Sequence, residues 1–146
     1  MSEDERWSIW ALLKEGSIGP ICLGAPAQAM ESIPVRCSGI SVSKAGNLRR
    51  YGMMQILESE GRITMIIVLL RHQVDSEAED FPSAAAVLTG MPPTEFRLEC
   101  ERRGLPVTPN AKLTSGDQTV LHVGVHADAI FGPVGLQRLV LGAVTK

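Results

Sequence analysis

The chain has 146 residues, of which 45% are hydrophobic and 21% are charged, and its formal net charge is −2. This composition is typical of a globular domain and excludes a disordered chain. The net negative charge disfavours a nucleic-acid-binding protein that relies on a basic surface. The longest apolar run, residues 63–70, is far shorter than a membrane span. We therefore expect neither a nucleic acid nor a membrane as partner.

The cysteines and the N-terminus indicate a reducing compartment. The chain has 3 cysteines, Cys22, Cys37 and Cys100, without close spacing, which predicts free thiols. The N-terminal stretch is acidic where a secretory signal would be basic. We therefore expect a cytoplasmic protein. Cys100 falls on the apolar face of a predicted helix, so we interpret it as a small buried hydrophobe rather than a nucleophile.

The first predicted element is a helix that ends at Gly16. Residues 2–5 have the spacing of a capping box, and Trp7 and Trp10 follow at helical spacing. Because tryptophan buries a large apolar area, we interpret both as anchors of this helix in the core. Tryptophan is also a favoured interface residue, so a binding role stays open. An extended stretch bounded by glycines, residues 18–24, follows.

The segment that begins at Pro26 predicts a helix, a loop and two strands. Pro26 suits the first turn of a short helix, and residues 38–47 are predicted to be a polar loop. A strand over residues 49–58, a turn containing glycine and a strand over residues 62–70 form a predicted hairpin. The last strand is apolar at nearly every position, which is typical of a central strand covered on both faces.

A second segment repeats this order after an acidic linker, residues 75–80, and a short alanine-rich helix, residues 83–88. Its helix begins at Pro92 and ends at Gly104, with acidic residues early and arginines late, as the helix dipole favours. A loop leads to the apolar strands of this segment, which are predicted over residues 118–125, 126–131 and 136–141.

The two segments share a plan although they have almost no identical residues. Hairpins are antiparallel, and the helices outside them have to cover a face of the sheet. We expect an α+β fold in a single domain, residues 1–146. It is an antiparallel sheet with helices packed on one face and two pseudo-repeated helix-loop-strand-strand halves, approximately residues 18–74 and 88–146. The apolar strand over residues 63–70 then leaves one face for a partner, a second copy or the other half.

No pattern for catalysis or metal binding competes with this interpretation. His122 and His126 would lie about 13 Å apart along a strand, at ~3.3 Å per residue, which is too far for two ligands of one zinc ion. We interpret them as partly exposed sheet histidines, and His72 as solvated. The glycines form no phosphate-binding loop, and no hydrolase or metalloprotease motif occurs. We expect no enzymatic activity, no catalytic residue, no metal and no cofactor.

Two groups of residues are candidates for binding another protein. The acidic linker is either a solvated connection or a patch that meets a basic partner. The Arg-Arg-Tyr cluster at the mouth of the first hairpin is either a partner surface or an ordinary strand edge. The candidate partner-binding residues are Asp75, Glu77, Glu79, Asp80, Arg49, Arg50 and Tyr51, together with the sheet face opposite the helices.

Two parts of the sequence resemble a group of small bacterial proteins, some of which are immunity proteins of polymorphic toxin systems. The opening carries Gly19-Pro20-Ile21-Cys22-Leu23-Gly24-Ala25-Pro26 before a short helix, and the closing part carries Thr94-Glu95-Phe96, Gly104-Leu105, Phe131-Gly132 and Leu136. The tandem halves are similar to the fold of the β-lactamase inhibitor protein, although the paired disulfide cysteines of that protein are missing. The resemblance implies a non-enzymatic protein that neutralises a cognate toxin by occluding its active site.

Two other functions stay open at this stage. One is a small-molecule-binding or enzymatic domain with a ligand cavity between the two halves, where binding pockets often form. A pocket lined by His122, His126 or Cys100 would favour it. The other is a structural homodimer in which residues 63–70 or the C-terminal strand pairs across a two-fold axis.

Overall fold

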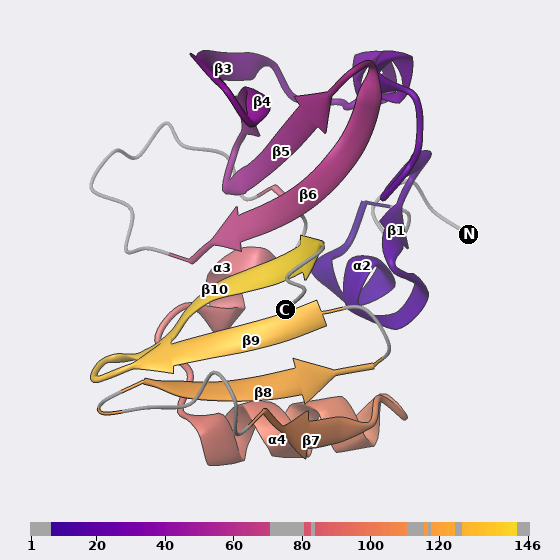
Figure 1. Cartoon of the computed structure of the whole chain (residues 1–146). Coiled ribbons are helices and arrows are strands. Elements are labelled where there is room, and N and C mark those ends of the chain that lie inside the picture. The colour runs from indigo at the N-terminus through magenta and orange to yellow at the C-terminus, as the bar shows by residue number, and fades with distance from the viewer. Residues whose placement is uncertain are drawn as a thin grey trace.

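The computed structural model describes residues 7–70, 81–82, 84–110, 116, 118–124 and 127–142. Its main feature is one antiparallel sheet of eight strands (Figure 1). The strands are β3 (Cys37–Ser43), β4 (Gly46–Tyr51), β5 (Met54–Ser59), β6 (Arg62–Leu69), β7 (Val107–Pro109), β8 (Thr119–Val123), β9 (Ala127–Gly132) and β10 (Gly135–Gly142). Their spatial order is β3-β4-β5-β6-β10-β9-β8-β7. The α+β class with an antiparallel sheet is therefore confirmed.

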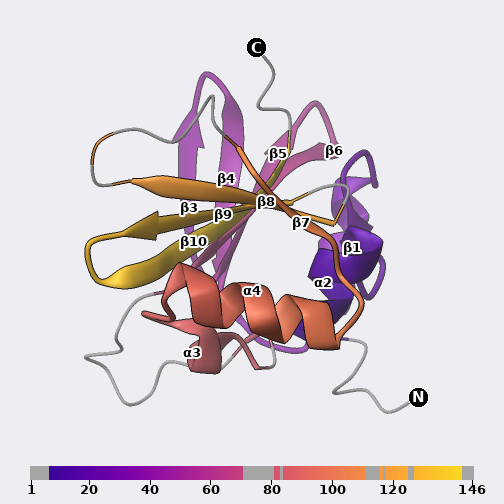
Figure 2. The ribbon, with the colours of Figure 1, turned by 90° about the horizontal axis from the view of Figure 1, so that it is seen from below.

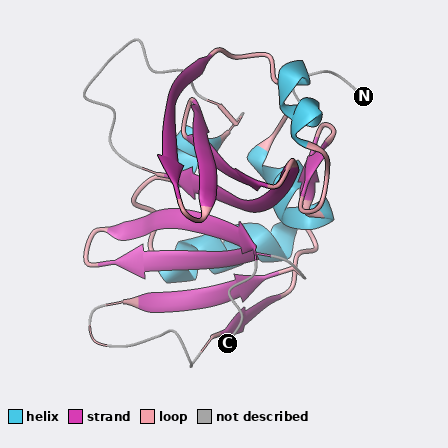
Figure 3. Ribbon diagram, turned by 45° about the horizontal axis from the view of Figure 1, so that its top comes forward, coloured by secondary structure: helices cyan, strands magenta, loops and turns pink. Residues whose placement is uncertain are grey.

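The remaining elements are short and lie beside the sheet. They are the helices α2 (Ile9–Glu15), η1 (Ala27–Ser32), α3 (Ala85–Leu88) and α4 (Pro93–Arg102), and the hairpin β1 (Ser17–Ile18) with β2 (Ile21–Cys22). Figure 2 shows α3 and α4 together on one side of the strands. Figure 3 shows how strongly the sheet twists between its two end strands, as successive strands of a pleated sheet do.

The helix predicted near the N-terminus is confirmed, but it begins later than residues 2–5 suggest. Ser8 is its N-cap, and its hydroxyl accepts a hydrogen bond from the Trp10 backbone N–H at 3.0 Å. Gly16 ends the helix in the left-handed conformation, as expected. Residues 2–5 lie outside the described part of the chain.

The strand predictions for the first half are partly wrong. Residues 38–47, predicted as a polar loop, form β3 and the start of β4, joined by a turn at Lys44-Ala45. The predicted strand over 49–58 is divided into β4 and β5, because Gly52 adopts φ 62° and turns the chain back. The first half therefore ends in four strands instead of two. The helix after Pro26 is confirmed in place but is a 3₁₀ helix.

The second half is closer to expectation. The helices α3 and α4 and the strands β8, β9 and β10 lie within or near their predicted ranges. The exception is β7, which lies in a segment predicted as loop, so this half also has four strands. β7 has only three residues and ends in a proline. A segment of this length is too short to show the alternation of apolar and polar residues that predicts a strand.

The central strand β6 buries one face and half-buries the other. Ile63, Ile66 and Val68 are at most 1% exposed, whereas Met65 and Ile67 are half-buried. Ile63 and Ile66 share a face because the pairing register with β5 shifts between Leu57 and Glu58, as at a β-bulge. The central position predicted for this strand is confirmed, but complete coverage of both faces is wrong.

Aromatic contacts join the helices to the sheet. Phe96 of α4 meets Phe131 of β9 edge to face, with ring centroids 5.6 Å apart, and stacks on Trp10 at 6.5 Å. Trp7 contacts Phe81 at 5.8 Å and is 8% exposed. The Arg103 guanidinium lies 4.1 Å from the centre of the Trp10 ring. Trp7 is a core residue just before the N-cap Ser8, and Trp10 is half-buried against the core, so the interpretation as core anchors of the helix is confirmed only in part.

Candidate functional site

The sheet face turned away from the buried core carries a shallow hollow. It extends over four neighbouring strands, from β6 in the middle of the sheet through β10 and β9 to β8. The hollow has a volume of about 300 Å³. Strand alternation produces it, because the neighbours of the buried residues in each strand point to the other face. Its apolar lining is Met65, Ile67, Val120, Ile130 and Val140, and its polar lining is Gln118, Asp128 and Arg138.

The pairing register shows how these side chains are placed. Ile67 is opposite Val140, and Val140 is opposite Asp128, so these three form one row across β6, β10 and β9. Arg138 lies between Leu69 and Ile130 in the next row. Directly opposed side chains in neighbouring strands lie close enough to interact. The face therefore combines a continuous apolar strip with a few charges.

The charges on this face are not equivalent. Asp128 Oδ1 lies 3.2 Å from His122 Nδ1 and accepts a hydrogen bond from Asn110 Nδ2, also at 3.2 Å. Arg138 is exposed and forms no ion pair among the described residues. The carboxylate is thus already bonded within the protein, whereas the guanidinium is exposed.

Arg50 adds a second available guanidinium to the same face. It is directly opposite Gln55 in β5, and Gln55 is opposite Ile67 in β6. Arg50 is exposed and, like Arg138, has no ion-pair partner in the part of the chain that the structure describes. An apolar strip beside two exposed guanidinium groups suits a partner that presents apolar side chains together with carboxylates.

Arg49 and Tyr51 point to the opposite face, because alternate residues of β4 point to alternate faces. They line a separate hollow of about 200 Å³ beside η1. Arg49 Nη2 lies 3.8 Å from Glu58 Oε1, and its Nε atom is buried without a hydrogen-bond partner. Tyr51 is 5% exposed, and burial raises the pKa of its hydroxyl. The Arg-Arg-Tyr cluster predicted from the sequence is therefore divided between two faces.

The other sequence-predicted candidates have different outcomes. Asp75, Glu77, Glu79 and Asp80 lie outside the described residues, as do His72 and His126. The side chain of His122 is 38% exposed and lies in β8, which confirms the prediction of a partly exposed sheet histidine. Among the described residues, no group of three or more His, Cys, Asp or Glu side chains could hold a metal ion.

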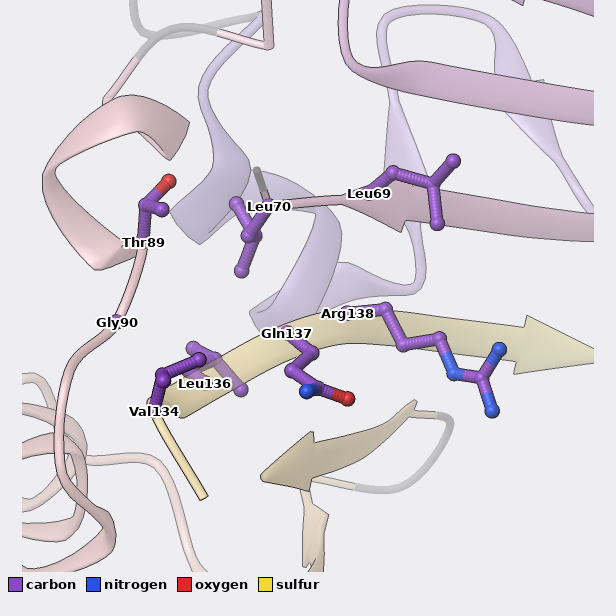
Figure 4. Close-up of a pocket in the computed structure, with 8 residues that line it drawn as sticks. All are labelled: Leu69, Leu70, Thr89, Gly90, Val134, Leu136, Gln137 and Arg138. Atoms are coloured by element: carbon purple, nitrogen blue, oxygen red, sulfur yellow. The ribbon is translucent and has the colours of Figure 1, made fainter. Parts of the chain in front are cut away.

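A second hollow, of about 430 Å³, lies where the α3–α4 connection meets β10 (Figure 4). Its walls include Leu70, Thr89 and Leu136. The Leu70 N–H donates to the Gln137 carbonyl at 2.8 Å, and the Gly90 N–H donates to the Leu136 carbonyl at 3.0 Å. The Gly90 bond fixes the connection against β10, and the Leu70 bond extends the pairing of β6 with β10. The Thr89 hydroxyl is buried there without a hydrogen-bond partner.

Cys100 is fully buried against the core, and burial raises the pKa of its thiol to about 12. The interpretation of Cys100 as a buried hydrophobe is confirmed. Cys22 and Cys37 are half-buried.

We expect Cys100 to resist a thiol-specific reagent at pH 8 in the folded protein, because both burial and a raised pKa keep its thiolate fraction low. The Cys22→Ser/Cys37→Ser variant isolates this thiol. Titration with the reagent should show no rapid reaction when the variant is folded and full reaction in denaturant. Rapid labelling under native conditions would show that α4 does not bury this residue.

No protein-family model, no curated protein and no solved structure matches this chain significantly. None of the described helices is long and apolar enough to cross a membrane.

Proposed function

We propose that this protein is a non-enzymatic protein-binding module whose partner docks on the open sheet face. The observation that carries the proposal is the apolar strip around Ile67 and Val140 with the exposed Arg50 and Arg138 beside it. Half-buried aliphatic side chains such as Met65, Ile67 and Val140 lose water favourably when a partner covers them, whereas Val120 and Ile130 of the same hollow are already buried. The arginines give the partner its orientation and select acidic groups.

The architecture behind this surface is part of the proposal. We infer that α2, α3 and α4 form one covering layer, which leaves the other face free. We also infer that β3–β6 and β7–β10, with the helices η1 and α4 before them, are two pseudo-repeated halves that meet at the β6–β10 pair. The support is that both runs are consecutive antiparallel meanders in mirrored order within the sheet.

As to the partner, we propose a cognate toxin whose active site is occluded, so that the protein is an immunity-type protein in the cytoplasm. The resemblance of the residue 19–26 segment supports this class. The two exposed arginines, Arg50 and Arg138, suit a toxin surface that carries carboxylates. The acidic linker, residues 75–80, remains a second proposed contact for a basic part of the partner.

Replacing Ile67 by Glu should weaken partner binding by at least ~30-fold, as expected for a central interface residue. It removes apolar contact and repels the carboxylates of the partner. The measurement is co-expression with the product of the gene immediately upstream, followed by affinity measurement of the purified complex and a cell-protection assay. Leu98→Glu is the control, because Leu98 is 55% exposed on α4. Equal weakening by both variants, or no complex with the wild-type protein, would contradict the proposal.

Arg138→Glu should act mainly on association. Reversing a charge at the rim of an interface slows encounter and reduces the dependence of the association rate on salt, to which Arg50 still contributes. Stopped-flow mixing at low and high ionic strength measures this. A faster association of Arg138→Glu would show that the partner surface is basic and not acidic.

A small-molecule site is the second candidate, and the hollow of about 300 Å³ favours it in one respect, because its volume reaches the lower end of ligand pockets. The junction between the halves is itself filled, since β6 and β10 pair directly over five residue pairs. A ligand would therefore lie either on the open face or at the end of the β6–β10 pair, in the hollow of about 430 Å³ beside Leu70 and Leu136. Competition between such a ligand and the protein partner would identify this function.

A further inference from the structure

The two end strands of the sheet differ in how well they are protected from further pairing. At one end, β7 has only three residues, and Pro109 lacks the N–H that a pairing strand would need. At the other end, β3 has seven residues, Cys37–Ser43, without a proline or a charged side chain. Natural proteins usually protect an edge strand by shortness, proline or charge. Only β7 has that protection.

The exposed side chains of β3 are apolar on one face. Ile40 is 58% exposed and Val42 is 79% exposed. Both lie on the same face, because they are two residues apart in a strand. Gly39 and Ser41 occupy the other face, so neither face carries a charge that would repel another strand.

The outward-directed backbone groups of β3 belong to the same two residues, Ile40 and Val42. The two-residue turn Gly52-Met53 makes Tyr51 and Met54 a hydrogen-bonded pair, so the even-numbered residues of β4 bond to β3. Their partners in β3 are Gly39, Ser41 and Ser43. Ile40 and Val42 therefore direct their N–H and C=O groups outward, along the open edge.

We propose that β3 pairs with β3 of a second copy of this chain, antiparallel, about a two-fold axis at Ser41. In this register Ile40 opposes Val42 of the second copy, and Val42 opposes Ile40. Each of these pairs joins two outward-directed backbones, so it forms both hydrogen bonds of a bonded pair. The same pairs bring two exposed apolar side chains into contact on one face.

A second copy fits this edge better than an unrelated strand because the edge is complementary to itself. An isologous interface requires that one surface matches its own image. Lys44 opposes Ser38 of the other copy, and no charge opposes a like charge. The sheet then continues across the axis with sixteen strands, twice the eight of one chain. The earlier homodimer prediction, through residues 63–70 or the C-terminal strand, is wrong because β6 and β10 each have a strand on both sides.

Sedimentation velocity of the full chain over about 5–500 µM tests the pairing, a range chosen because a single pair of strands makes a small and weak interface. We expect a monomer–dimer equilibrium for the wild-type protein. Ile40→Lys and Val42→Glu should each raise the dissociation constant at least ~10-fold. Val134→Lys is the matched control, because Val134 is 71% exposed in a turn away from β3. Thermal unfolding of each variant verifies that it is folded.

The double variant Ile40→Lys/Val42→Glu tests the register. It places lysine against glutamate twice across the axis, so it should recover most of the affinity that each single variant loses. Ser41→Cys gives a second readout, because residue 41 faces itself as a non-bonded pair, in which the Cα atoms are about 4.5 Å apart and a disulfide can form. Oxidation should link this variant and leave the wild type unlinked. A monomer at every concentration, or a double variant weaker than both single variants, would overturn the proposal.

Discussion

Replacing Phe96 by alanine is expected to lower the free energy of unfolding by about 3–5 kcal/mol, the usual cost of removing a buried phenylalanine. Phe96 is 0% exposed and contacts two aromatic rings, Trp10 of α2 and Phe131 of β9. Its loss leaves a cavity that three separate elements line. Those elements cannot close it without moving α4 against the sheet. Denaturant-induced unfolding, monitored by tryptophan fluorescence and circular dichroism, measures the change.

Leu98→Ala on the same helix is the control. Leu98 is 55% exposed, so its truncation should change the stability by no more than ~0.5 kcal/mol. If Phe96→Ala and Leu98→Ala had equal and small effects, α4 would not be the element that closes the core over β9.

Gly135→Ala should be the second most damaging single change, with a loss of roughly 3 kcal/mol or more. Gly135 has φ +98°, and a Cβ atom there would meet the Gly90 carbonyl oxygen. The backbone of the α3–α4 connection would have to move away from β10. That movement would break the bond from the Leu136 N–H to the Met91 carbonyl, which is 2.9 Å long. Thermal and denaturant unfolding give the stability loss.

Gly104→Ala separates the two causes. Gly104 also has a positive φ, +73°, but no heavy atom lies within 4 Å of its Cβ position. It therefore carries only the conformational cost of a side chain in the left-handed region, about 1–2 kcal/mol. A loss at Gly135 as small as that at Gly104 would show that the contact with Gly90 yields easily.

Local patterns in the sequence predicted most helices and the inner strands. The end of α2 at Gly16, the start of α4 at the two prolines and the turn between β5 and β6 each depend on one or two residues whose backbone preference is strong. The polar strand β3 was missed. Its serines and glycine are typical of a loop and have a low strand propensity. It forms a strand because it pairs with β4, whose backbone supplies the hydrogen bonds.

The candidate site was predicted only in outline. The excess of apolar residues over 63–70 predicted a second face that a partner, a second copy or the other half would cover, and Met65 and Ile67 are half-buried on that face. Arg138 was not among the predicted residues, because no motif surrounds it. Only the pairing of β10 with β6 and β9 brings Arg138 beside Leu69 and Ile130. Arg50 was predicted together with Arg49 and Tyr51, and the pleat of β4 separates it from both.

The sequence by itself determined the globular α+β class, the end of α2 at Gly16, the turns that follow β5 and β9, and the strand that is too apolar for a one-sided sheet. These properties depend on interactions within a few residues along the chain. Only the tertiary structure decided that β6 and β10 meet at the middle of the sheet, that β3 and β7 are its edges, and which arginines share a face with Ile67. Strand order and register arise from pairing between residues far apart in sequence, where hydrophobic burial selects among many locally equivalent arrangements.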